Sequence, residues 1–396
     1  MSGAGVTDQA GFTPPAYPYD RLAPLQEAAE RVPGGMVDLS IGTPFDPPPD
    51  AVVAALGASG RERGYPPSIG TPAYREAAVG WLSRRFGVSV PVSQAAACVG
   101  TKELVAGLPH WLRLRTPDRD TVLYPAVSYP SYAMGATLAG CRAVAVPMDE
   151  HWRLDLSAID EADAARALCL WVNTPGNPAG GLDDLGAAAA WGRANGVPVL
   201  SDECYIEFTW DAGDGAGPHA PVSGEVPGRT ILEHGTEGVL AVHSLSKRSN
   251  LAGVRAGFYA GDAELVAYLS ELRKHAGFLV PGPVQAAAVV AFDDDRHVDE
   301  QRARYWTRLE LMRSVLAGVG VDAPAPGGAF YLWAPAPGGD AWALARRLAT
   351  EGGVLVSPGE FYGEAGAGHI RVAVVQPDER LALVGERLAA LRSSPA

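Results

Sequence analysis

The 396-residue sequence is poor in cysteine, and its thiols are widely spaced, at Cys98, Cys141, Cys169 and Cys204. Three of these cysteines lie in or at the end of apolar, strand-like runs, which is typical of buried free thiols rather than of disulfides or metal ligands. The eight histidines show no ligand spacing, and His243 is best interpreted as a packed residue at a strand end. The sequence therefore predicts neither a disulfide framework nor a metal site.

Long apolar runs and an excess of positive charge are also missing. The longest apolar runs, such as residues 286–292, are far too short to span a bilayer, and residues 1–8 lack the basic and apolar parts of a secretion signal. The formal net charge of −13 disfavours nucleic acid or an anionic membrane surface as a partner. We therefore expect a cytoplasmic protein with no membrane and no nucleic-acid partner.

Apolar, strand-like runs recur through the first two thirds of the chain. Several are separated by stretches with helical periodicity, such as residues 102–112 and 185–195. The expected strands are residues 96–99, 121–123, 142–146, 168–172, 197–200, 239–242 and 256–260. This alternation is typical of an α/β fold in which helices cover both faces of one sheet.

The last part of the chain favours a smaller, mixed α+β unit. A charge-rich helix over residues 297–316 is expected to connect it to the sheet. The strands expected after it are residues 329–333, 353–356 and 369–374, and the helices are residues 341–349 and 378–391. A segment rich in Gly, Ala and Pro at residues 211–228 is expected to form a mobile loop, either a solvent-exposed insertion or a lid.

One segment combines the groups that a small phosphorylated aldehyde would need. Ser244, Ser246 and Lys247 follow an apolar strand, and Arg255 comes eight residues after the lysine. A lysine amine condenses with an aldehyde to a Schiff base, and hydroxyls with a planar guanidinium can hold a dianionic phosphate. Pyridoxal phosphate is the cofactor that needs both. Taken alone, the segment is better interpreted as a turn that carries a solvated lysine.

Two further loops carry side chains suited to the same cofactor. Asp202 follows an apolar strand, and its carboxylate would keep the ring nitrogen of pyridoxal protonated, so that the ring accepts electrons. Tyr205 and Asn177 would donate hydrogen bonds to the phenolic oxygen of the ring. Each loop also has a simpler interpretation, with Asp202 as a turn or cap residue and residues 173–180 as an ordinary Pro/Gly/Asn loop.

The positions of these groups agree with one another. Residues 100–101, 173–177, 202–205 and 244–247 each follow the carboxyl end of an expected strand. Open α/β sheets bind ligands at this edge, and scattered turn residues would not all fall on it. The sequence therefore predicts a single ligand site at the carboxyl ends of the strands.

In order and spacing, the motifs resemble those of the class I/II aminotransferases of pyridoxal-phosphate fold type I, over nearly the whole chain. The motifs are Asn173-Thr-Pro-Gly-Asn177-Pro, Asp202-Glu-Cys-Tyr205, Ser244-Leu-Ser-Lys247 and Arg255. The resemblance implies a large cofactor-binding domain over residues 46–290, with a mixed seven-stranded sheet flanked by helices. It also implies a small α+β domain made of residues 1–45 and 291–396.

Within that family, the chain is most similar to the N-succinyldiaminopimelate aminotransferases. The segments that carry this narrower likeness are residues 38–44, 100–103, 242–247 and 272–277. Two departures from the family pattern are Ala179 in place of the usual Thr, and Arg248 with its two successors in place of small residues. Neither departure removes a catalytic group, so both are expected to bear on substrate choice.

The resemblance assigns further residues to the cofactor. Gly100, Thr101 and Lys102 would open a helix whose N–H groups, with the Thr101 hydroxyl, bind the phosphate, although Thr101 alone also fits a helix N-cap. Tyr129 would stack on the pyridine ring, or else it is a packed core tyrosine. Tyr65 would reach the phosphate of the neighbouring subunit's cofactor, which implies a homodimer with shared active sites.

Substrate contacts are implied as well, from Gly42, Lys102, Asn177 and Arg371. Arg371 would clamp the α-carboxylate, and an arginine inside an apolar strand is in any case costly unless it is paired. Gly42 would bring its backbone close to the substrate, or else it is a turn residue. Lys102 is the best local cation for carboxylates at the far end of the substrate, and it is equally compatible with a surface position on a helix.

The implied activity is pyridoxal-phosphate-dependent amino transfer in two half-reactions. Lys247 would shuttle the proton, so burial and the positive ring must lower its pKa. The implied substrates are an amino acid, glutamate, and a keto acid, N-succinyl-2-amino-6-oxopimelate, which becomes N-succinyl-LL-diaminopimelate in lysine biosynthesis. The open alternatives are a broad aminotransferase for aromatic, branched or alanine-type amino acids, a C–S β-lyase on the same fold, and a catalytically silent pyridoxal-binding regulator, against which Lys247 argues.

Overall fold

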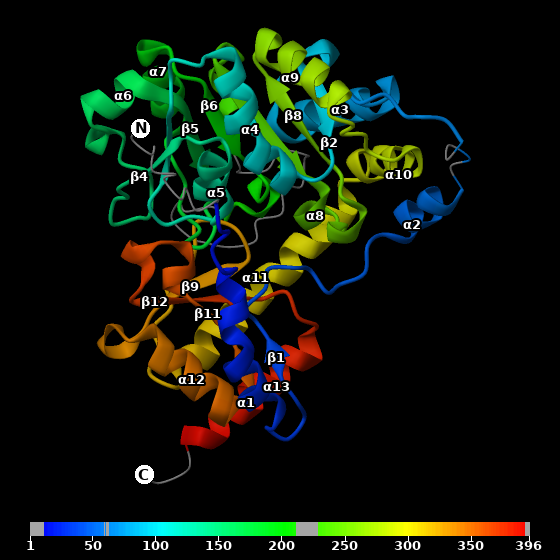
Figure 1. Ribbon diagram of the computed structural model, residues 1–396. Helices are drawn as coiled ribbons and strands as arrows, with labels where there is room; N and C mark the ends of the chain where they lie inside the picture. Colours follow the sequence, from blue (N-terminus) through cyan, green and yellow to red (C-terminus); the bar gives the residue numbers. More distant parts are fainter. Residues whose placement is uncertain (1–11, 59, 61–62, 211–228, 393–396) are drawn as a thin grey trace, which may run out of the picture.

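The computed structural model describes residues 12–58, 60, 63–210 and 229–392, so the segment 211–228 lies outside the described residues. Its main feature is a seven-stranded sheet with the order β2-β8-β7-β6-β5-β3-β4 (Figure 1). The strands are β2 (Ala95–Cys98), β3 (Thr121–Pro125), β4 (Arg142–Val146), β5 (Ala167–Asn173), β6 (Val199–Asp202), β7 (Val239–Ser244) and β8 (Gly257–Gly261). The predicted mixed sheet of seven strands is confirmed.

The direction of the strands decides where the site forms. Strands β7, β6, β5, β3 and β4 are parallel to one another, whereas β8 is antiparallel to both β7 and β2. Two reversals make β2 run the same way as β7. The carboxyl ends of β2, β5, β6 and β7 therefore share one edge with the amino end of β8.

Hydrophobic cores cover both faces of this sheet, except at the edge strand β4, most of which is exposed. Successive strand residues point to opposite sides. In β7, Val239 and Ala241 pack into one hydrophobic core, and Leu240 and Val242 pack into another. Helices α3 (Pro72–Phe86), α7 (Leu185–Asn195) and α10 (Gly282–Asp293) contribute to the first core. Helices α4 (Thr101–Arg115), α5 (Ser131–Leu138) and α9 (Ala263–His275) contribute to the second.

A third core joins elements from both ends of the chain. Its strands are β1 (Val37–Asp38), β9 (Tyr331–Pro335), β10 (Val354–Leu355), β11 (Ser357–Pro358) and β12 (His369–Ala373). Strands β11, β12 and β9 form an antiparallel sheet, and β1 pairs with β10 in parallel. Around them lie α1 (Ala23–Glu30), α12 (Ala341–Gly352) and α13 (Asp378–Arg392). Figure 1 shows α11 (Arg296–Ala317) running between this group and the large sheet.

The remaining elements are short. They are α2 (Asp50–Gly57), α6 (Glu161–Arg166), α8 (Leu245–Arg248) and the 3-10 helices η1 (Pro18–Leu22), η2 (Val92–Gln94), η3 (Leu156–Ala158), η4 (Ile206–Phe208), η5 (Ile231–His234), η6 (Ala252–Val254), η7 (Pro337–Gly339), η8 (Gly359–Tyr362) and η9 (Glu364–Gly366). Among the described residues, no helix is long and apolar enough to cross a membrane.

Most predicted strand boundaries were wrong by one or two residues, and three of these shifts have a local reason. Strand β6 begins at Val199 rather than at residue 197, since Pro198 has no N–H to donate to a ladder. Strand β9 begins at Tyr331 because Ala329 has a left-handed φ of 62°. Strand β10 begins after Gly353, which has a φ of 64° and ends helix α12.

Candidate active site

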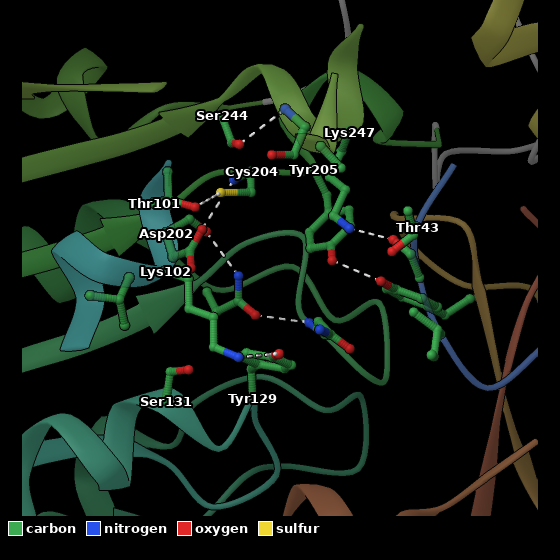
Figure 2. Close-up of a pocket in the computed structure, with 18 of the residues that line it drawn as sticks. Thr43, Thr101, Lys102, Tyr129, Ser131, Asp202, Cys204, Tyr205, Ser244 and Lys247 are labelled. Atoms are coloured by element: carbon green, nitrogen blue, oxygen red, sulfur yellow. Dashed lines mark hydrogen bonds between the residues drawn. The ribbon is translucent and has the colours of Figure 1, made fainter. Parts of the chain in front are cut away.

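A cavity of about 530 Å³ opens at the sheet edge where the four carboxyl ends meet. Of the residues predicted for the site, all but Gly100 and Tyr65 line it. Those that line it are Gly42, Thr101, Lys102, Tyr129, Asn177, Asp202, Tyr205, Ser244, Ser246, Lys247, Arg255 and Arg371. Figure 2 shows Thr101, Cys204 and Asp202 together on one side, with Lys247 and Thr43 across the cavity from Lys102 and Ser131.

One end of the cavity is built from Gly100, Thr101 and Arg255. Gly100 is the N-cap of α4, and a Cβ at this position would lie 2.2 Å from Nη2 of Arg255. Thr101 is the first helical residue, so its interpretation as the N-cap was wrong; its Oγ1 lies 3.3 Å from Sγ of Cys204. Only a glycine fits against the guanidinium, and the open helix N-terminus beside it suits an anion.

The rest of this end comes from the lysine segment and the start of β8. Ser244 is the last residue of β7, and its Oγ accepts a hydrogen bond from the N–H of Ser246 at 3.1 Å. Arg255 has a left-handed φ of 56° just before β8, and its Nη1 donates to the carbonyl of Ala252 at 2.8 Å. Hydroxyls, a guanidinium and a helix N-terminus together fit a dianionic phosphate.

Asp202 forms the floor of the cavity at the end of β6. Its Oδ2 accepts a hydrogen bond from Tyr132 at 2.8 Å, and its Oδ1 accepts one from the backbone N–H of Cys204 at 3.2 Å. Burial raises the pKa of this carboxyl, against the opposing effects of these hydrogen bonds and of Lys247. Asp202 therefore makes the contact expected of a turn residue and also lines the cavity. A cation placed against its carboxylate would offset the cost of removing the charge from water.

Lys247 reaches across the cavity from α8. Its Nζ donates a hydrogen bond to the backbone carbonyl of Gly42. Burial, reinforced by the charges of Arg371 and Arg255, lowers its pKa to about 8, whereas Asp202 acts in the opposite direction. Roughly a tenth of this amine is therefore unprotonated at pH 7, far more than of an ordinary lysine, and the unprotonated form is the one that a general base needs.

Arg371 is a buried cation on β12, and only 1% of its side chain is exposed. Its Nη1 donates to Oδ1 of Asn177 at 2.8 Å, and its Nη2 donates to Tyr19 and to the carbonyl of Ser40. Within the described part of the chain it forms no ion pair with Asp or Glu, and its buried Nε has no hydrogen-bond partner. A guanidinium in this state can receive a carboxylate.

Lys102 lies at the mouth of the cavity between two tyrosines. Its Nζ donates to the hydroxyl of Tyr129 at 3.2 Å and to that of Tyr17 at 3.4 Å, and these hydroxyls are 3.2 Å apart. The ammonium also lies 5.1 Å and 5.3 Å from the two ring centroids. Burial raises the pKa of Tyr129. The side chain of Lys102 is exposed to solvent, and its ammonium therefore lies at the rim of the cavity.

Besides Gly100, which has no side chain, Tyr65 is the predicted residue that does not line the cavity. Its side chain is 97% exposed. Gly42, in contrast, lines the cavity. Its backbone packs so tightly against Tyr331 that a Cβ at this position would lie 2.0 Å from the Tyr331 hydroxyl. Tyr205 is buried, and its hydroxyl lies 2.8 Å from that of Tyr331.

Several residues of the cavity were not predicted from the sequence. Tyr331 supports Tyr205 and lies under Arg371, with 4.3 Å between the guanidinium and the ring centroid. Tyr132 holds Asp202, and its only sequence signal was its place in the same motif as Tyr129. The sequence did suggest that residues 17–20 close over the site, without showing which tyrosine enters, and both Tyr17 and Tyr19 line the cavity.

The structure also shows the surroundings of the cysteines, which were predicted to be free thiols, and of His243, which was predicted to be a packed residue. All four cysteines are free. The ring of His243 packs 4.8 Å from Phe258 and 5.0 Å from Trp81, and burial lowers its pKa to about 3. Among the residues that the structure describes, no group of three or more His, Cys, Asp or Glu is placed to hold a metal ion.

Comparison with known proteins gives the family. Residues 34–388 match the model of aminotransferase class I and II. The chain is 42% identical over 377 residues to 4-dedimethylamino-4-oxo-anhydrotetracycline transaminase OxyQ of Streptomyces rimosus, covering 94% of this chain and 99% of the relative. It is 34% identical over 385 residues to LL-diaminopimelate aminotransferase of Desulforudis audaxviator, with 94% and 95% covered.

Among solved structures, a probable N-succinyldiaminopimelate aminotransferase from Thermus thermophilus superposes with a TM-score of 0.80 at 30% identity. The match covers 94% of this chain and 99% of that structure. The chain therefore belongs to the class I and II aminotransferases, enzymes that use pyridoxal 5'-phosphate and exchange amino groups between amino acids and keto acids.

Proposed function

We propose that this aminotransferase moves an amino group from glutamate to N-succinyl-2-amino-6-oxopimelate, which yields N-succinyl-LL-diaminopimelate. The observation that carries this proposal is the charge of the cavity. Four cations line it, Lys102, Lys247, Arg255 and Arg371, against one carboxylate, Asp202. The cofactor phosphate and one substrate carboxylate account for two of these cations, and Lys247 is the amine that the aldehyde needs. Lys102 is left for a second carboxylate.

The residues of the cavity fit the cofactor. When bound, pyridoxal phosphate supplies an aldehyde that takes up the amino group and a ring that accepts electrons. Thr101, Ser244, Ser246 and Arg255 would hold its phosphate, in the space that a Cβ at Gly100 would close.

The ring of the cofactor has partners of its own in the cavity. Asp202 would hold the ring nitrogen, and Asn177 and Tyr205 would face the phenolic oxygen. Tyr129 would stack on the ring. All four side chains line the same cavity.

The remaining side chains would act on the substrate. Arg371 is available for the α-carboxylate, because its guanidinium is buried and has no acidic partner among the described residues. Asn177 and the backbone of Gly42 would keep the bound amino acid beside Lys247. The Nζ of Lys247 would then take the proton from the substrate Cα, helped by its lowered pKa.

A panel of substrates tests the substrate assignment. Each donor and acceptor is scored by the loss or return of the visible absorbance of the bound cofactor, with L-glutamate, L-alanine, L-phenylalanine and N-succinyl-LL-diaminopimelate included. The variant Lys102→Gln should raise KM about tenfold for substrates with a distal carboxylate and leave that for L-alanine within about twofold. Lys274→Gln, which changes an exposed helix lysine, is the control. An equal loss for all substrates would sink the role of Lys102.

An aminotransferase for aromatic substrates is the second candidate. It is favoured by the tyrosines at the mouth of the cavity, where Tyr17 and Tyr19 stack with ring centroids 5.4 Å apart. The relative OxyQ, named for a tetracycline intermediate, points in the same direction. Faster turnover with L-phenylalanine than with N-succinyl-LL-diaminopimelate in the same panel would decide for it.

We further propose that the enzyme is a homodimer with shared sites. The support is Tyr65, a large aromatic side chain that is fully exposed on a single chain. Mixing Tyr65→Phe with Lys247→Ala subunits should give heterodimers in which one site carries both lesions and the other carries neither. Activity above that of either parent variant supports sharing, once Tyr65→Phe alone is shown to be impaired. A fully active monomer at assay concentration would exclude it.

A further inference from the structure

A cluster of charged side chains lies behind the cavity and takes no part in the roles above. Arg85, Glu207 and Arg248 are at most 3% exposed, and none of them is among the residues that line the cavity. Buried charges are costly unless they are well paired, so such a cluster is expected to serve a purpose.

The carboxylate of Glu207 is the centre of the cluster. It accepts hydrogen bonds from Nε1 of Trp81 at 2.6 Å, from Nη2 and Nε of Arg85 at 2.9 Å and 3.1 Å, and from Nε of Arg248 at 3.2 Å. Trp81 and Arg85 belong to the fifteen-residue helix α3. Glu207 itself lies in η4, two residues after Tyr205. The bonds therefore fix the Asp202 loop to a long helix.

Arg248 ties the lysine segment to the same centre. It is the last residue of α8, directly after Lys247, and a helix of four residues has almost no stability of its own. The Nη2 of Arg248 donates to Asp295 at 3.1 Å, its Nη1 donates to the carbonyl of Ala291, and its guanidinium lies 5.4 Å from the Trp81 ring. The end of α8 is therefore fixed by contacts from outside the helix.

We propose that the Glu207–Arg248 ion pair is a positioning device for Lys247. It fixes the position of α8 relative to the Asp202 loop, so that the Lys247 amine stays between the carbonyl of Gly42 and Asp202 at the cavity floor. The sequence predicts that Arg248 bears on substrate choice. Its guanidinium does not line the cavity, however, so we expect its replacement to affect Lys247 rather than the substrate. This inference rests on the reaction class of the family and is independent of the proposed substrate.

The test uses the full-length chain with the variants Arg248→Met, Arg248→Lys and Glu207→Gln. The control is Arg308→Met, which removes a buried arginine (3% exposed) that pairs with Asp46 and Asp378 and does not line the cavity. Thermal unfolding of each protein shows how much general stability is lost.

The main readout needs no substrate. The chain has three lysines, Lys102, Lys247 and Lys274, so acetylation by acetic anhydride can be followed at each of them by peptide mass spectrometry. In the cofactor-free chain, the pH midpoint of labelling at Lys247 reports its surroundings, which include Arg371, Arg255, Cys204 and Asp202. Lys274 is the exposed reference.

We expect the midpoint for Lys247 to rise by about one pH unit in Arg248→Met and Glu207→Gln, because a loosened amine gains water. The rate at which L-glutamate or L-alanine, whichever the parent uses faster, bleaches the bound cofactor should fall about ten- to a hundredfold, as expected for a misplaced base. The midpoint and the bleaching rate of Arg248→Lys should lie between those of the parent and of Arg248→Met, since an ammonium keeps the positive charge but not the planar set of N–H donors of a guanidinium. Arg308→Met should change neither.

The proposal is overturned if folded Arg248→Met and Glu207→Gln keep the parent's midpoint and bleaching rate, or change them no more than Arg308→Met does. If Arg248→Met does not fold, Glu207→Gln and Arg248→Lys carry the same two readouts, because both preserve the size of the side chain. A parental midpoint and rate in both of these variants would likewise overturn the proposal.

Discussion

Replacing Gly100 by alanine should weaken the binding of the cofactor through Arg255. The glycine has φ 73° and ψ 155°, a conformation that is almost exclusive to glycine and costs other residues about 1–3 kcal/mol. Its new Cβ would also lie 2.2 Å from Nη2 and 2.6 Å from Cζ of Arg255. Because the guanidinium is the flexible partner, it should move away from the place where, on the proposed function, it would meet the phosphate.

The size of the expected loss in cofactor affinity follows from the hydrogen bonds that the displaced Arg255 would no longer make. Hydrogen bonds to a charged group contribute about 1.5–3 kcal/mol, which converts to roughly 10- to 150-fold in the Kd for pyridoxal phosphate. The Kd is measured by fluorescence quenching during titration of the cofactor-free enzyme. Gly320→Ala is the control, since Gly320 also has a positive φ, of 83°, but open space around it. It should lose stability and keep the parent's Kd.

A double-mutant cycle makes the reasoning refutable. If Gly100→Ala acts by displacing Arg255, then Gly100→Ala and Arg255→Met should each weaken binding by similar factors, and the double variant should be little worse than either. Parental affinity in Gly100→Ala, or losses that add fully in the double variant, would refute the displacement of the guanidinium.

Three further outcomes are expected at the floor of the cavity. Lys247→Ala should lower turnover by about 10²–10⁴-fold or more in a folded protein that still binds the cofactor, and activity within about tenfold of the parent would exclude Lys247 as the base. Asp202→Asn keeps the acceptor for the N–H of Cys204 yet loses the charge, so kcat should fall about 10²–10³-fold with little change in Tm, whereas unfolding with normal specific activity would favour a turn role.

The third outcome concerns pH. The folded pKa of Lys247 is about 8, below the ordinary 10.5, so the unfolded state binds more protons between these values. The stability of the cofactor-free chain should therefore gain from rising pH in this window, and Lys247→Met, measured by urea unfolding, should remove that gain.

The large sheet could be predicted from the sequence because its strands are buried on both faces. Such strands are continuous apolar runs, and the residues after them are polar for a reason of chemistry rather than of folding. Asp202 and Lys247 therefore stood out by position as well as by type. The errors were shifts of one or two residues at both ends of strands, and at some starts a single proline or a left-handed residue decides the boundary, as at Pro198 and Ala329.

The supporting side chains could not be predicted in the same way. Tyr331 meets Tyr205 across 126 residues of chain, and Tyr132 meets Asp202 across 70. No spacing in the sequence encodes such pairs, since Tyr205 and Tyr331 meet only when the third core forms, and Tyr132 meets Asp202 only when α5 packs on the large sheet. Tyrosines inside apolar strands and helices are common as packed residues, so neither stood out from its neighbours.

Arg248 shows a second limit of prediction from the sequence. As a departure from the family pattern that removes no catalytic group, it was predicted to bear on substrate choice more than on the reaction. On a helical turn, however, adjacent residues project about 100° apart, so the residue beside an inward-facing lysine points elsewhere. Its partner Glu207 is 41 residues away and equally buried. A charge beside a catalytic residue is therefore as informative about what holds that residue as about what it binds.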